Sequence, residues 1–190
     1  MSESTSQNFL ESMYKKMGVA RTVVIFGLLF IISQLSIAMI ISSLGPENML
    51  TLQTTFSKEV FKDILEKWGS EGIQTYKKHF YIDFFHPFIY GIFLSSFFAF
   101  LTAGLRKKSL KLYLVVFLLP LIAGLCDIIE NTLHLILLSN IDNLSEIMIW
   151  ISAAFCNLKW LLAFLSTGII LFIILLRVKS GAAFSESKRE

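Results

Sequence analysis

Four apolar runs, each long enough to cross a lipid bilayer, constrain this chain more than any other feature of its sequence. They lie near 22–44, 80–105, 112–138 and 147–176. A hydrocarbon core of about 30 Å requires around 20 helical residues. Backbone groups in lipid must form hydrogen bonds within the protein, which favours helices here because the runs lack the alternation of barrel strands. The sequence therefore predicts an all-α integral membrane protein built as a bundle of four transmembrane helices.

The composition agrees with this fold class. Hydrophobic residues make up 55% of the chain and charged residues 16%, whereas soluble domains have about 25% charged residues. We expect a single membrane domain over 1–190, with polar, disordered ends at 1–12 and 180–190. The net charge of +3 is not concentrated in a basic patch with interleaved aromatic residues. This pattern excludes nucleic acid as a partner.

Basic residues are distributed unevenly around the apolar runs. Lysine and arginine gather in 15–21, 106–111 and 177–189, whereas the segment between the third and fourth runs contains none. Because such residues favour the cytoplasmic side, both termini are predicted to be cytoplasmic. The membrane is then the inner membrane of a bacterium or, in a eukaryote, the endoplasmic reticulum.

The first extracytoplasmic loop is predicted to contain an amphipathic helix. Phe61, Ile64, Leu65 and Trp68 follow the spacing i, i+3, i+4, i+7 among charged residues, and Gly69 is expected to end the helix. Three placements stay open for it. It packs against the ends of the spans, lies on the outer membrane surface, or covers a site below as a lid.

Ionisable residues interrupt three of the apolar runs. They are Asp83, His86, Asp127, Glu130, His134 and Lys159. A charged side chain at the bilayer centre costs roughly 3 kcal/mol even on lenient insertion scales. Such residues persist where they form pairs, face a cavity or take part in chemistry. They indicate a polar site inside the membrane.

Helical spacing places these residues on common faces. In the second run the face consists of His79, Asp83, His86 and Tyr90. In the third run it consists of Asp127, Glu130, Asn131 and His134. In the fourth run Asn157 and Trp160 share a face, and the long stem of Lys159 can reach around to the same side.

Antiparallel packing of consecutive spans brings these faces to one depth. It places His86 level with Glu130, and Asp127 level with 157–159. We therefore predict one polar pocket between the second, third and fourth spans, opening toward the non-cytoplasmic side. Pro87 removes the helical hydrogen bond to the carbonyl of Asp83, and Pro120 acts similarly on the third span. These prolines either widen the pocket and free carbonyl groups or only shape the packing.

Three functions remain open for such a pocket. The first is binding of a lipid-like or small hydrophobic ligand, with conversion by acid–base chemistry. Its catalytic candidates are Glu130, His86, Asp83, Asp127 and His134. Its substrate-binding candidates are Tyr90, Asn131, Asn157, Lys159 and Trp160.

The second function is a hydrolase or oxidase that uses zinc or iron, with ligands from His86, His134, His79 and Glu130. The third is a proton- or ion-coupled carrier, or a non-enzymatic protein that binds membrane lipid. Four spans are few for a carrier, so a carrier of this size is expected to form a homodimer. Structural roles also stay open, because Asp127 with Lys159 can form an ion pair and the two asparagines can form interhelical hydrogen bonds.

Asn157 and Trp160 stand three residues apart late in the chain, after Glu130 and His86. Over the last three spans these residues loosely resemble the family of emopamil-binding sterol isomerases and sigma-2 receptors. The resemblance implies a small helical membrane protein with buried acidic residues.

The chain has no P-loop, dinucleotide fingerprint or nucleophile-elbow motif. Cys126 and Cys156 lie inside predicted spans, where we expect reduced thiols.

Overall fold

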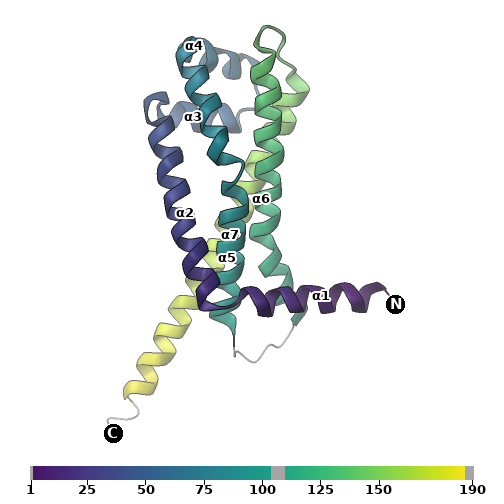
Figure 1. Cartoon of the computed structure of the whole chain (residues 1–190), viewed down its shortest axis with the longest axis vertical. Coiled ribbons are helices and arrows are strands. Elements are labelled where there is room, and N and C mark those ends of the chain that lie inside the picture. The colour runs from purple at the N-terminus through teal and green to yellow at the C-terminus, as the bar shows by residue number, and fades with distance from the viewer. Residues whose placement is uncertain (1, 104–109, 187–190) are drawn as a thin grey trace.

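The structure, a computed structural model, describes residues 2–103 and 110–186, and side chains over 7–103 and 110–179. Within these residues, seven α-helices and two short 3-10 helices form an elongated bundle (Figure 1). In chain order they are α1 (Ser2–Met17), α2 (Ala20–Ile41), η1 (Ser42–Leu44), α3 (Pro46–Thr54), α4 (Lys58–Asp83), α5 (His86–Thr102), α6 (Leu110–Ser139), η2 (Ile141–Asn143) and α7 (Glu146–Glu186).

The predicted fold class is confirmed. Three helical segments are long and apolar enough to cross a membrane: Ala20–Leu44, Leu110–Ser139 and Glu146–Lys179. Helices α4 and α5 pass the same test as a pair, with a bend of 44° between them. The bundle therefore has three to four long apolar helices that fit a membrane.

The second span, predicted over 80–105 with Pro87 disturbing the turn at Asp83, is broken into two helices at that place. Helix α4 ends at Asp83 and α5 begins at His86, so the break falls at 84–85. Pro87 explains it, since proline has no N–H and its ring crowds the preceding turn. The last residues of the predicted span, 104–105, and the basic turn Arg106–Lys108 lie outside the described residues.

The structure describes helix at both ends of the chain, where the sequence predicts disorder over 1–12 and 180–190. Helix α1 covers most of 1–12, because its end is held to the bundle through Tyr14. The Tyr14 ring packs edge-on against Phe98 and Phe117, and its hydroxyl bonds to Thr102. Burial raises the pKa of this hydroxyl. Helix α7 continues past 180 to Glu186, with no proline to stop it; residues 187–190 lie outside the description.

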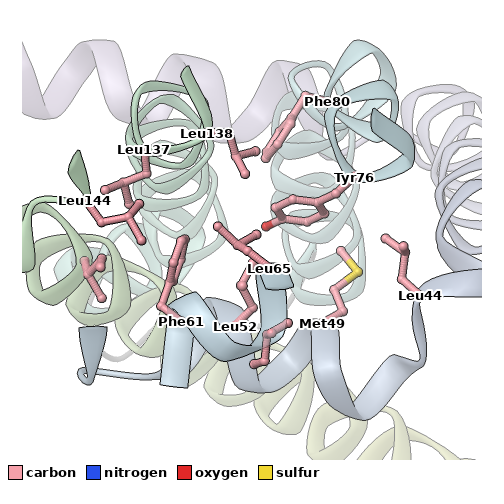
Figure 2. Packing of buried hydrophobic residues seen from close by; sticks show 12 residues of the cluster. Leu44, Met49, Leu52, Phe61, Leu65, Tyr76, Phe80, Leu137, Leu138 and Leu144 are labelled. Carbon is pink, nitrogen blue, oxygen red and sulfur yellow. The ribbon is translucent and has the colours of Figure 1, made fainter. Parts of the chain in front are cut away.

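The predicted amphipathic helix is present as the first part of α4. It ends where expected, because Gly69 takes a φ of 60° and a non-helical ψ, a conformation that favours glycine. Its apolar face is buried against α3 and the ends of α6 and α7, forming one hydrophobic cluster (Figure 2). The placement against the ends of the spans is therefore the one observed.

Helix α3 was not predicted. It begins at Pro46, directly after Gly45 with a φ of 76°, a turn that glycine adopts without strain. Its buried residues Met49 and Leu52 join the same cluster. Helix α3 thus forms part of the layer that covers one end of the bundle (Figure 1).

Helices α5 and α6 approach each other closely through matching proline and glycine residues. A Cβ on Gly124 would lie 2.8 Å from the carbonyl oxygen of Pro87, and a Cβ on Gly91 would lie 3.2 Å from that of Pro120. In each helix the glycine follows the proline by four residues. Small residues allow such close backbone contact in membrane helices. This contact fixes the position of α5 along the axis of α6.

Candidate functional site

A buried ion cluster joins α6 to α7. The Lys159 ammonium lies 2.8 Å from Oδ1 of Asp127 and 2.7 Å from Oε2 of Glu130. Lys159 is only 8% exposed and Glu130 is fully buried. The two carboxylates share one face of α6, and the lysine stem reaches around α7 to both, as the spacing predicted. One ammonium therefore neutralises part of the charge of two carboxylates.

Asp127 and Glu130 differ in their other contacts. Asp127 also interacts with the Tyr90 hydroxyl of α5. Glu130 interacts with the Cys156 thiol of α7 in addition to Lys159. Asp127 thus connects the cluster to α5, whereas Glu130 is held mainly by Lys159.

His86 connects α5 to α2. Its Nδ1 lies 2.8 Å from the hydroxyl of Ser33, and its ring stacks on Phe30 at a centroid distance of 5.6 Å. The sequence placed His86 level with Glu130, and both are candidates for acid–base chemistry. The structure instead turns His86 toward α2 and Glu130 toward α7, so the two side chains serve different contacts.

The helix break leaves a carbonyl group that a neighbouring helix uses. The carbonyl oxygen of Asp83 loses its helical partner because Pro87 has no N–H. Asn131 of α6 donates its Nδ2 to this oxygen at 3.2 Å. Of the alternatives left open for Pro87, the loss of a helical hydrogen bond at the Asp83 carbonyl is observed, and a side-chain amide is the new donor.

A second polar cluster lies toward the covered end of the bundle. The Tyr76 hydroxyl lies 2.7 Å from Nδ1 of His134, and Nδ1 of His79 bonds to the Tyr76 carbonyl. His79 Nε2 lies 3.5 Å from the Asp83 carboxylate. His79 and His134 therefore have protein partners, although Nε2 of His134 has none among the described residues.

A groove of about 570 Å³ runs beside the ion cluster, bounded by α2, α3, α5 and α7. Seven of its polar lining residues lie toward one part of the groove: Gln34, Gln53, Asp83, His86, Tyr90, Asp127 and Lys159. Apart from Thr167, the remaining lining is apolar and extends along α5 through Phe93 and Phe97, and along α7 to Ile174. The groove thus has a polar region and a long apolar region.

The structure brings together part of the predicted site. Asp83, His86, Tyr90, Asp127, Lys159 and Trp160 line the groove. Glu130 contacts the groove only through Lys159. His79, His134 and Asn131 lie behind it, and the exposed Asn157 donates to the carbonyls of Ala153 and Thr54. The first span and α3 also form walls, which differs from the predicted pocket of the last three spans alone.

The suggested metal ligands do not form a cluster. Among the described residues, no group of three or more His, Cys, Asp or Glu side chains is placed to hold a metal ion. His86 faces Ser33, whereas His79 and His134 contact Tyr76. The role suggested for these histidines and Glu130 with zinc or iron stays a prediction from the sequence.

Sequence reasoning missed four groups of the site. Ser33 and Gln34 are adjacent polar residues within the first apolar run, a signal that was available. Tyr76 and Gln53 lie in a segment where polar residues are common, so the sequence does not indicate that they are buried. Their burial results from the packing of α3 and α4.

The fold and the site define a class, a polytopic membrane protein with buried polar and charged residues. Comparison with known protein families, curated proteins and solved structures finds no match to this chain. The resemblance to the emopamil-binding isomerases and sigma-2 receptors gains no support from these comparisons.

Proposed function

We propose that this protein binds a lipid-like amphiphile in the groove between α2 and α7. The observation that carries the proposal is the division of one groove into two parts. Asp83, His86 and Lys159 offer hydrogen bonds in the polar region, and the other region is apolar except for Thr167. A few polar groups that fix orientation within an apolar pocket are typical of ligand sites.

Entry from the lipid phase is consistent with the position of the groove. Phe164 and Leu171 line it and yet are 67% and 55% exposed, so its mouth lies along the side of the bundle. Helix α2 packs on α4 and α5, whereas α7 packs most extensively on α6. The groove between α2 and α7 therefore opens toward the surface that lipid covers in a membrane.

Acid–base conversion of the ligand would depend on the groups that face the groove. Asp83 and His86 line it, whereas Glu130 is buried and held by Lys159. Binding is accordingly the function that we propose, with His86 and Asp83 as the groups in reach of a bound head. No observation favours the metal-dependent or carrier hypotheses over binding.

The test of this proposal is the lipid retained by the purified protein. Ala163 lines the groove on α7, and Ala163→Trp would fill it. Leu161→Trp adds the same ring on α7 at a residue that is 63% exposed and lies outside the groove lining. Mass spectrometry of lipid extracts should show a near-stoichiometric amphiphile in the wild type and in Leu161→Trp, and its loss in Ala163→Trp. Equal lipid content in all three proteins would contradict the proposal.

A further inference from the structure

We propose that the occupant of the groove is a single-chain amphiphile with a small, uncharged polar head, such as a long-chain alcohol. This inference rests on the proposed function and specifies its ligand. Three observations carry it: the charge of the polar region, the cover over the groove, and the length of the apolar region.

The charge of the polar region disfavours an anionic head. Lys159 is the only lysine or arginine among the described residues that line the groove. Its ammonium is already shared by Asp127 and Glu130 at 2.8 and 2.7 Å. Asp83 adds a further carboxylate to the same region. A phosphate would therefore meet more negative than positive charge, and like charges repel strongly where water is scarce.

A hydroxyl group suits the same residues. It can donate a hydrogen bond to the carboxylate of Asp83 or Asp127 and accept one from a nitrogen donor. His86 and Lys159 supply such nitrogen atoms in the groove lining. An uncharged head thus finds both acceptors and donors without bringing a second charge into the bundle.

Helix α3 covers the polar region and limits the size of the head. Pro46, Met49 and Gln53 of this helix line the groove. The end of α3 is tied to α7, because Asn157 donates to the Thr54 carbonyl at 3.4 Å. Just beyond it, Phe56 packs on Trp150 at a centroid distance of 5.2 Å. A bulky, hydrated head such as phosphocholine would have to displace this cover.

The apolar region has the length of one lipid chain. From Lys159 to Ile174, helix α7 advances about 22 Å at a rise of about 1.5 Å per residue. This length is close to one leaflet, since a whole bilayer measures roughly 40–45 Å with its head-group regions. The groove volume of about 570 Å³ suits one ligand of moderate size. We infer one chain, lying along Phe97 and Ile170.

Three probes with the same sixteen-carbon chain separate the features of the head. They are 1-hexadecanol, hexadecyl phosphate and palmitoyl lysophosphatidylcholine, each added to the purified protein at the same mole fraction of detergent. The measurement is the midpoint of thermal unfolding. A ligand that binds only the folded state at about 100 times its Kd should raise the midpoint by roughly 5–10 °C for a chain of this size.

We expect this rise with hexadecanol in the wild type and in Leu161→Trp, and no rise in Ala163→Trp. Thr167→Trp, at another residue of the groove lining, serves if Ala163→Trp does not fold. The other two probes should leave the midpoint unchanged. An equal rise with either of them would overturn the inference about the head.

The thermal shifts, taken together with the lipid extracts of the purified proteins, distinguish the two proposals. If no probe binds, and the wild type still retains a lipid that Ala163→Trp loses, the single-chain inference is wrong and the groove binds another amphiphile. If no probe binds and no lipid is retained, the proposed function fails as well.

Discussion

At the scale of single residues, Lys159 is the cation that stabilises two buried carboxylates in this bundle. Its ammonium lies between Asp127 and Glu130, so each carboxylate has a cation at hydrogen-bond distance. Removal of one partner from a buried ion pair leaves an uncompensated charge, which is far more unfavourable than removal of all partners together. The cluster therefore requires its members as a set.

Substitution of Lys159 tests this statement. We expect Lys159→Met to destabilise the folded protein by about 3–5 kcal/mol, because two buried carboxylates lose their cation. The triple variant Lys159→Met, Asp127→Asn, Glu130→Gln should recover most of that loss. Chemical denaturation in detergent measures both effects, and a triple variant as unstable as the single one would contradict a role for charge.

A second prediction at the scale of single residues concerns the substitution of Gly124. Gly124→Ala would place a Cβ 2.8 Å from the Pro87 carbonyl oxygen, so backbone would have to move. We expect a loss of about 1–3 kcal/mol, as for other overpacked sites. Gly168→Ala is the matched control, because nothing lies within 4 Å of its added Cβ. Equal melting temperatures for the two variants would argue against close packing of α5 on α6.

At the scale of elements, the break between α4 and α5 is stabilised from α6. Pro87 removes one hydrogen bond to the Asp83 carbonyl, and Asn131 supplies another. The two residues should therefore be coupled energetically, although they lie on different helices.

A double-mutant cycle measures that coupling. Asn131→Leu should destabilise the wild type by about 1–3 kcal/mol, since the Asp83 carbonyl is left without a donor. In a Pro87→Ala background the new N–H of residue 87 can bond to that carbonyl, so Asn131→Leu should have a smaller effect. A coupling energy near zero in unfolding experiments would contradict this account of the break.

The elements also show what the sequence can and cannot predict. The apolar runs and the amphipathic face of Phe61 and Leu65 followed from hydrophobicity and helical spacing alone, whereas the Asp127–Lys159 pair was one of the alternatives that the spacing left open. Helix α3 did not, because its nine residues have no strong periodicity and their burial depends on α4 and α7. The partner of His86 was missed for a related reason, since spacing within one helix does not reveal which neighbour it faces.

At the scale of the whole molecule, α1 and the end of α7 lie at the same end of the bundle, opposite α3 and the start of α4 (Figure 1). We predict that both termini are cytoplasmic, as the basic residues indicate. Single cysteines at the exposed positions Ser12 and Val178 should react with an impermeant maleimide only after cells are opened. A cysteine at the exposed Asp142 should react in intact cells, and the reverse pattern would contradict this orientation.

The most direct test of the groove as a lipid site is photolabelling. The reagent is a hexadecanol analogue with a diazirine at the last carbon, and peptide mass spectrometry locates the label. We predict label near Phe97 and Ile174, at the far end of the apolar region, and its loss in Ala163→Trp. Label on the outward residues Leu161 and Leu165, unchanged in Ala163→Trp, would contradict a bound chain in the groove.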